Sequence, residues 1–428
     1  MRDHIAPRRY SAGVLRPEEA QEWSRGRSPP KTVQPMGDRP HSVPPRSGRR
    51  SRCVLYCLPA QFLSSSVLAS SDFASSVLDF TPAPGQFINN SIFNDPARAL
   101  GPPVGGGTLA ADNSKLVSLG GFAGSITLAF DHTVLDDPSN RFGIDAIVFG
   151  NAIWSSGNPR RRWAEAGIIE IALDANSNGL ADDPWYPIRA PGLPPIPASA
   201  LQSQLWDNNA GTPTPPANIA WYPSPVHYPG WPPSYITTAF RLPPIYEVNL
   251  LINPNGPAAT LEAHWGLADL SPTLILGDLD ADNLVDDPEL TPAEFYTRPD
   301  NPFLVGITAE SGGGDGFDIA WAVDPVSGAP AELPGFDFIR ISTGVNFIAG
   351  ILGELSTEVG GVADARPDES AFDLNADGRI DIEDLYTWHD LRDASDPAAD
   401  LTGEGVIDDA DRLMMTRCTR RDEVHDVH

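Results

Sequence analysis

Acidic and amide residues alternate with other residues in one short stretch near the C-terminus. Counted from Asp373, oxygen-bearing side chains stand at positions 1, 3, 5, 9 and 12, namely Asp373, Asn375, Asp377, Asp381 and Asp384. Gly378 at position 6 permits a sharp turn, and Arg379 at position 7 offers its backbone carbonyl. Calcium requires about six to eight hard oxygen ligands, and this spacing supplies them from one turn. The pattern predicts a calcium loop over residues 373–384; the alternative is a solvated acidic turn.

A second copy of the pattern begins 27 residues later, with Gly405 again at position 6. Its oxygen-bearing side chains are Asp400, Thr402, Glu404, Asp408 and Asp411. Both copies end on aspartate where the standard loop has glutamate. The shorter side chain leaves open whether position 12 binds through one oxygen or two.

Each loop is followed by apolar residues at helical spacing. The side chains that carry this spacing are Leu385, Trp388 and the stem of Arg392 after the first loop, and Ala410, Leu413, Met414 and Arg417 after the second. Ile380, at position 8 of the first loop, is expected to pack inward. Each unit is therefore predicted to be a loop followed by a helix.

This duplicated arrangement resembles a dockerin domain over residues 371–421. The resemblance implies a small helical, EF-hand-like domain that folds around two calcium ions. It also implies that the tail binds a cohesin-like or other surface protein. Calcium is accordingly the cofactor that we expect for this chain.

Two further acidic loops lie within the body of the chain, each after a predicted strand. The first offers Asp174, Asn176, Asn178, Asp182 and Asp183 around Gly179. The second offers Asp278, Asp280, Asp282, Asp286, Asp287 and Glu289, with Asn283 at position 6 in place of glycine. Asparagine tolerates a positive φ angle there. Both loops are predicted to bind calcium; the alternative is a turn held by side-chain-to-backbone hydrogen bonds.

The elements that must position these loops are short strands separated by Gly, Pro, Asn and Asp. The stretches that read as strands are KLVSLGG, GSITLAFD, IDAIVFGN, AGIIEIALD, YEVNLLIN, PTLILGD and FDFIRISTGV. Helical periodicity is nearly absent before the tail. Many short strands with turns between them predict a mainly β body built as a β-sandwich or jelly roll.

Three strings in the body, FNDPARALGPPVGGGT, GSITLAFDHTVLDDPSNRFGIDAIVFGN and GGGDGFDIAWAVDPVSGAPAELPGFDFIRISTGVN, carry a resemblance of their own. They look like a family of exported bacterial cell-surface proteins with a jelly-roll-like β-sandwich. The resemblance implies export and this fold, and it implies no catalytic residues.

Residues 184–246 contain 16 prolines and nine of the 19 Trp and Tyr residues of the chain. Flat aromatic side chains held by extended, proline-rich backbone could stack on sugar rings, which makes Trp221, Tyr228, Trp231 and Tyr235 the ligand-binding candidates. The alternative is that these aromatic side chains pack the segment onto the sandwich. In either case the segment is expected to be ordered.

The charge of the chain is strongly acidic, with 57 Asp and Glu against 29 Lys and Arg. Nucleic acid is therefore excluded as an expected partner. Three cysteines are present, at 53, 57 and 418. Because the first two lie in the predicted signal peptide, the mature chain cannot form an intrachain disulfide, and no apolar run of 18 or more residues follows to predict a transmembrane span.

An arginine-rich segment before CVLYCLPAQFLSSSVLAS has the layout of a secretory signal that is cleaved after Ala69. Translation from Met36 would fit this layout best; the alternative is a disordered tail on a cytosolic protein. The expected organisation is a basic leader (1–35), signal peptide (36–69), body (70–362) with the excursion 184–246, linker (363–370), dockerin-like domain (371–421) and tail (422–428).

These features predict an exported, calcium-binding modular surface protein. Its β-sandwich is expected to bind a glycan or matrix component, and its dockerin-like tail to dock it to a partner. The alternative is a polysaccharide-degrading glycosyl hydrolase delivered by the same tail. No nucleophile motif, zinc motif or phosphate-binding loop is present to favour catalysis, and carboxylate pairs cannot be chosen from sequence.

Overall fold

The computed structural model describes residues 71–85, 87–189, 196–208, 218–242, 265–346 and 356–425. The chain divides into two units, residues 1–69 and 70–428, and every described residue belongs to the second. The predicted leader and signal peptide lie outside the described residues, as does the strand expected at 246–253.

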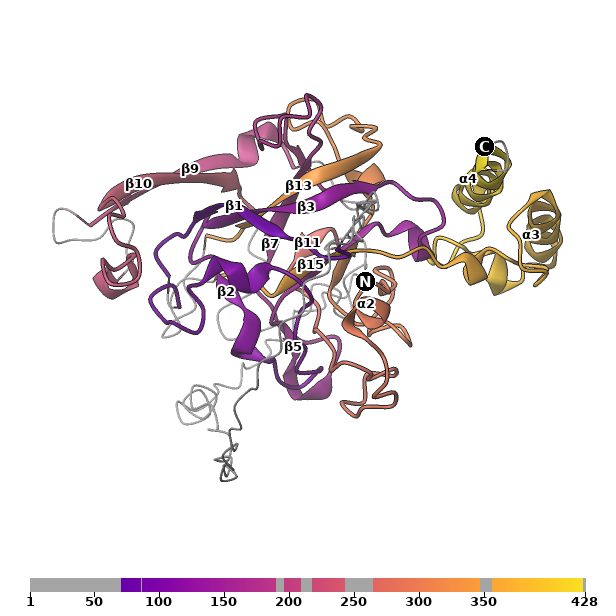
Figure 1. Ribbon diagram of the computed structural model, residues 1–428, viewed down its shortest axis with the longest axis horizontal. Helices are drawn as coiled ribbons and strands as arrows, with labels where there is room; N and C mark the ends of the chain where they lie inside the picture. Colours follow the sequence, from indigo (N-terminus) through magenta and orange to yellow (C-terminus); the bar gives the residue numbers. More distant parts are fainter. Residues whose placement is uncertain are drawn as a thin grey trace, which may run out of the picture. The chain divides into compact units, whose positions relative to one another are not determined.

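The largest sheet is antiparallel and runs in the order β1 (Ser76–Thr81), β3 (Ser125–Leu135), β13 (Gly335–Thr343), β7 (Gly167–Ala172) and β11 (Leu267–Ala268). The short strand β8 (Tyr186–Pro187) also pairs with β7. Figure 1 shows β1, β3 and β13 alongside one another. Strands far apart in sequence are neighbours here, since β13 lies between β3 and β7.

A second sheet runs in the order β12 (Asp315–Phe317), β4 (Ala146–Phe149) and β15 (Gly361–Asp364). Its side chains share one continuous apolar core with those of the large sheet, including Ile126, Ile341, Ile147 and Val362, which are all fully buried. Two antiparallel sheets on one core make the body mainly β, as predicted.

Three further strand pairs complete the body. They are β2 (Val117–Ser118) with β14 (Glu358–Val359), β5 (Ile153–Trp154) with β6 (Arg162–Trp163), and β9 (Leu201–Asp207) with β10 (Ser234–Phe240). The single-turn helices are α2 (Pro292–Phe295) and 3-10 turns at Pro96–Ala99, Asn113–Lys115, Arg141–Gly143, Ser155–Gly157, Ala198–Ala200, Ile219–Trp221, Ile319–Trp321, Glu369–Ala371 and Pro397–Ala399.

The strands predicted from KLVSLGG, GSITLAFD, IDAIVFGN, AGIIEIALD and FDFIRISTGV are present as β2, β3, β4, β7 and β13. The strand predicted over residues 272–278 is wrong. Its backbone forms one isolated bridge, between Thr273 and Gly313, and then turns into the acidic loop at Asp278. The glycine and the aspartates that follow end the pairing that its apolar residues suggested.

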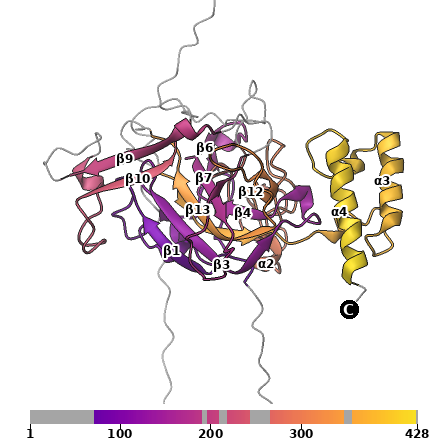
Figure 2. The same cartoon turned by 90° about the horizontal axis from the view of Figure 1, so that it is seen from above.

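The proline- and aromatic-rich segment contains an unpredicted antiparallel hairpin of β9 and β10, visible in Figure 2. Trp206 is fully buried, and its indole N–H donates to Thr237 Oγ1 over 2.9 Å. Trp206 packs with Phe122 and Tyr222 in a separate apolar cluster. In its described parts, this segment is therefore folded onto the body.

The C-terminal residues form two longer helices, α3 (Ile382–Ala394) and α4 (Asp409–His425), which lie side by side (Figure 1). They share a small core made of Phe372, Ile380, Trp388, Ala399, Leu401, Met415 and Cys418. Ile380 packs inward as predicted. Leu413, one of the residues that carry the helical spacing, is 56 % exposed, because α4 turns Met415 and Cys418 toward the core.

The body extends beyond the predicted boundary at residue 362, because β15 pairs with β4 as far as Asp364. The expected linker is also tied to the body by its backbone. The amides of Ala365, Arg366 and Asp368 donate to the carbonyls of Asp145, Thr297 and Ser139. Among the described residues, no helix combines the length and apolar character needed to cross a bilayer.

Candidate metal centres

The four acidic loops share one backbone conformation. At position 4, φ is 56° in Ser177, 63° in Ala281, 58° in Ala376 and 74° in Gly403. At position 6, φ is 73° in Gly179, 71° in Asn283, 84° in Gly378 and 85° in Gly405. Left-handed residues at these two positions wrap the chain around the side chains of positions 1, 3 and 5.

A hydrogen bond fixes the first aspartate in the same way in every loop. The backbone N–H at position 6 donates to the Oδ2 atom at position 1 over 2.7 Å in loop 174–185, 3.0 Å in loop 278–289 and 2.8 Å in both tail loops. The aspartate at position 1 is therefore held in the same position relative to the turn in all four loops.

In the two tail loops, the aspartate at position 12 accepts hydrogen bonds from the backbone amides at positions 3 and 9. Asp384 accepts hydrogen bonds from the amides of Asn375 (3.1 Å) and Asp381 (2.9 Å). Asp411 accepts the equivalent bonds from Thr402 (3.0 Å) and Asp408 (2.8 Å). Both carboxylates are fully buried. The two loops are thus structural copies of one another, as their spacing predicted.

The remaining tail residues follow the loop pattern less uniformly. Asp377 accepts the amide of Arg379 over 3.0 Å, and the Thr402 hydroxyl donates to Asp411 over 3.0 Å. Burial, followed by the charges of Asp408, Asp411 and Asp400, raises the pKa of Glu404. Part of that shift therefore comes from the like charges that the loop holds close together.

Loop 278–289 brings three of its predicted ligands together. Carboxylate oxygens of Asp278, Asp280 and Asp286 lie within 4.8 Å of one another. Asp278 is fully buried, and its Oδ1 atom has no hydrogen-bond partner. Burial raises its pKa. The other predicted ligands, Asp282, Asp287 and Glu289, do not belong to this trio.

Asn283 takes the place of glycine in that loop with the positive φ angle that was expected. Its side chain also anchors the loop to the glycine-rich segment before Thr108. The Asn283 Oδ1 atom accepts the Thr108 amide over 2.7 Å, and its Nδ2 group donates to the Thr108 hydroxyl over 3.0 Å. The loop is therefore fixed to the body by a contact that the sequence pattern did not indicate.

Loop 174–185 is more exposed than the others. Its amides face its carboxylates, since Asn178 Nδ2 lies 3.3 Å from both oxygens of Asp182, and Asn176 Nδ2 lies 3.4 Å from Asp182 Oδ1 and Asp183 Oδ2. Rotation of either amide by half a turn would present its carbonyl oxygen instead. Four of the five predicted ligands, Asn176, Asn178, Asp182 and Asp183, therefore contact one another through their side chains.

The four aromatic residues chosen as ligand candidates are partly buried and packed on one another or on the body. Trp231 makes edge-to-face contacts with Tyr228 and Tyr235, at centroid distances of 5.9 and 5.5 Å. The hydroxyls of Tyr228 and Tyr235 donate to the carbonyls of Ile88 and Pro82, each over 2.7 Å, and Trp221 packs against the cluster around Trp206. This geometry supports the packing alternative over a sugar-stacking platform.

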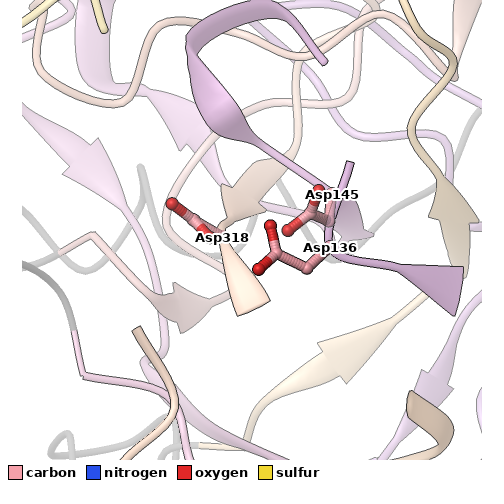
Figure 3. Close-up of side chains that lie close together, drawn as sticks. All are labelled: Asp136, Asp145 and Asp318. Atoms are coloured by element: carbon pink, nitrogen blue, oxygen red, sulfur yellow. The ribbon is translucent and has the colours of Figure 1, made fainter. Parts of the chain in front are cut away.

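Two carboxylate clusters in the body were not predicted. Figure 3 shows the first, in which Asp136, Asp145 and Asp318 lie together. The Asp145 carboxylate accepts hydrogen bonds from the side-chain amide of Asn140 and the backbone amide of Ile319, each over 2.9 Å. The Asp136 carboxylate accepts one from the guanidinium of Arg417, also over 2.9 Å. Burial raises the pKa of Asp318 to about 7. Each of these carboxylates already has a donor.

The second cluster joins Glu165, Asp269 and Glu358. Burial raises the pKa of Glu165 to about 8 and raises those of Asp269 and Glu358 well above their usual range. Asp318 in the first cluster and all three residues of the second are far from their partners in sequence, so no local spacing could have revealed either complete cluster. No protein-family model matches the chain, and no curated protein matches it either.

Proposed function

We propose that this chain is an exported, calcium-dependent modular surface protein. Its body is a jelly-roll-like β-sandwich that binds a surface ligand. Its C-terminal pair of loops and helices is a dockerin-like domain that docks the body to another surface protein. In this proposal, calcium ions bind the acidic loops of the body and those of the tail.

The observation that carries the proposal is the shared conformation of the four acidic loops. Each places positive φ angles at positions 4 and 6 and directs the position-6 amide to the first aspartate. Such a loop brings several carboxylates close together, which is unfavourable unless a cation lies between them. The orphan Oδ1 of buried Asp278 adds an unsatisfied acceptor in one of these centres.

The docking role rests on the internal symmetry of the tail. Two loops with equivalent position-12 aspartates and two neighbouring helices form one compact unit with its own core. The glycan or matrix ligand rests on the resemblance of the body to cell-surface proteins, since the four aromatic candidates are engaged in packing. The carboxylates with the most strongly raised pKa values lie in the interior, so they add no support to a hydrolase.

Calcium titration of the full chain by isothermal calorimetry, after chelation, tests the proposal. Asp373→Ala should weaken binding at the first tail loop by roughly tenfold or more, because it removes a charged ligand that also organises the turn. Thr402→Ala should have a smaller effect, since it removes only a neutral hydroxyl. Asp390→Ala is the matched control, because Asp390 is an exposed aspartate of α3 outside both loops.

Absence of measurable calcium binding by the wild-type chain would overturn the proposal. Docking is tested separately by retention of the calcium-loaded chain on immobilised cohesin domains. The ligand of the body is tested on a glycan array, with the chelated protein as the reference. If loading with calcium changes neither result, the calcium loops are clips that stabilise the fold and have no binding role.

A further inference from the structure

Three carboxyl groups from distant parts of the chain meet inside the body. Glu165 precedes β7, Asp269 follows β11, and Glu358 lies in β14. One carboxylate oxygen of each lies within 4.8 Å of the others. Asp269 and Glu358 are fully buried, whereas Glu165 is partly exposed at the edge of the group.

Asp269 is held in place by three backbone amides. Its Oδ1 atom accepts the N–H groups of Asn151 (2.9 Å) and Ala152 (3.1 Å), and its Oδ2 atom accepts that of Glu358 (3.1 Å). The absence of a side chain at Gly150 allows this approach, since a Cβ there would lie 2.3 Å from Asp269 Oδ1. Three amide donors favour the ionised form of this carboxyl group.

Glu358 has no such support. Both of its carboxylate oxygens are buried, and neither accepts a hydrogen bond. The hydroxyls of Ser118 and Ser356 lie near enough to affect Glu358, but they are bonded to each other over 2.5 Å, and Ser356 Oγ also accepts the Gly120 amide. The bond between the two hydroxyls uses one of their two protons, so at most one serine is left to donate to the carboxylate. A buried carboxylate without a partner is strongly destabilising.

No ion pair neutralises the group. In the part of the chain that the structure describes, the Lys, Arg and His side chains that form salt bridges are all paired with other carboxylates. Three carboxylates this close need either a cation between them or protons shared among them. In the first case the cluster binds a metal ion, and in the second it binds only protons.

We propose that Glu165, Asp269 and Glu358 form a buried binding site for a divalent cation of the calcium class. All the nearby ligand groups are oxygens, from three carboxylates and two serine hydroxyls, which suits a hard cation rather than zinc or copper. Glu165 is the most exposed of the three residues, so the ion would enter from its side of the cluster. The bound ion would clamp the starts of β7 and β14 to the end of β11.

This site is separate from the four acidic loops and does not rest on the proposed function. Native mass spectrometry of the full chain, loaded with Ca²⁺ and freed of excess ion, counts the ions held by each variant. Glu358→Gln should hold one ion fewer than the wild type. Glu170→Gln, which makes the same change in β7 at a residue paired with Arg340, should hold the wild-type number.

Asp373→Ala should lose a tail ion and keep the buried one, so failure of the loops and failure of this site give different results. An unchanged ion count in Glu358→Gln would overturn the proposal. If that variant does not fold, Glu165→Gln at the edge of the group serves in its place. A crystal structure of the wild type grown with calcium provides the second measurement.

In such a crystal, density about 2.3–2.6 Å from oxygens of all three residues supports the site. Short carboxyl-to-carboxyl contacts of about 2.5–2.7 Å with no ion between them would show shared protons and overturn it.

Discussion

His132 lies between two carboxylates and joins the two sheets. Its Nδ1 atom is 2.9 Å from Asp131 Oδ1, and its Nε2 atom is 2.8 Å from Asp364 Oδ2 in β15. Burial alone would lower the pKa of His132, but the hydrogen bonds to Asp131 and Asp364 and the charges of these residues outweigh it and raise the pKa. The folded state therefore holds the imidazolium more strongly than the unfolded chain does.

A raised histidine pKa stabilises the fold at low pH. The contribution is fully present below the unfolded value of about 6.5 and is lost as pH rises through the folded pKa. His132→Gln should therefore destabilise the protein by about 1 kcal/mol at pH 5.5 and by less at pH 8.5. Urea unfolding at constant calcium measures this, with exposed His227→Gln as the control. An equal loss at both pH values would contradict the assignment.

Asn283 combines two roles that substitution can separate. Its positive φ angle belongs to the loop, and its side chain bonds to Thr108. Asn283→Gly keeps the backbone conformation and loses the side-chain bonds, at a cost of about 1 kcal/mol. Asn283→Ala loses the bonds and also strains the backbone, adding about 1 kcal/mol. Thermal unfolding should rank wild type, Gly and Ala in that order; a more stable Ala variant would argue against strain at this position.

At the scale of elements, the tail is too small to bury enough apolar surface by itself. Its core is built from Ile380, Trp388 and a few neighbours, and the Trp388 indole donates to the Ala399 carbonyl over 2.9 Å. The loops that hold this core together carry the clustered carboxylates. Calcium binding and folding should therefore be coupled.

The isolated tail, residues 366–428, should lose most of its helix when chelated and regain it with calcium. Trp388 is the only tryptophan in that segment, so its fluorescence reports burial directly. Asp384→Ala should fail to fold at calcium levels that fold the Asp390→Ala control. Far-UV circular dichroism checks the helix content. A chelated tail that is already fully helical would contradict the coupling.

How well the elements could be predicted depended on how local their causes are. β3, β7 and β13 follow from short apolar runs between turn residues, and the tail loops follow from fixed spacing around a glycine. The β9–β10 hairpin was missed because its many flanking prolines obscure strand patterns. Its burial depends on Trp206 reaching Phe122, a contact between distant residues that no local pattern encodes.

The candidate sites also differ in whether local sequence or long-range packing forms them. The conformation of loop 278–289 could be predicted because its ligands lie within twelve residues. The convergence of Glu165, Asp269 and Glu358 could not be predicted, because β7 and β11 pair in the large sheet, β14 pairs with β2, and only the tertiary packing brings the three residues together. Glutamates next to strands are common, and only their burial without partners distinguishes this group.

At the scale of the whole molecule, acidic charge is the dominant electrostatic feature. After residue 69 the chain has 52 acidic and 17 basic residues, and many of the acids are gathered in loops. Such an excess repels itself in the compact state. Sodium ions reduce this repulsion only by diffuse screening, whereas a calcium ion bound between carboxylates removes it locally and also stabilises the folded state by mass action.

The full chain should therefore respond differently to calcium and to salt. Calcium at about a hundred times the dissociation constant contributes about 2.7 kcal/mol per site that binds only the folded state. With several sites, the melting temperature should rise by at least about 5 °C relative to the chelated protein. Sodium chloride at equal ionic strength should produce a much smaller rise, because it only screens. Differential scanning calorimetry compares the two conditions, and equal shifts would mean that the loops act as a diffuse acidic surface without specific metal sites.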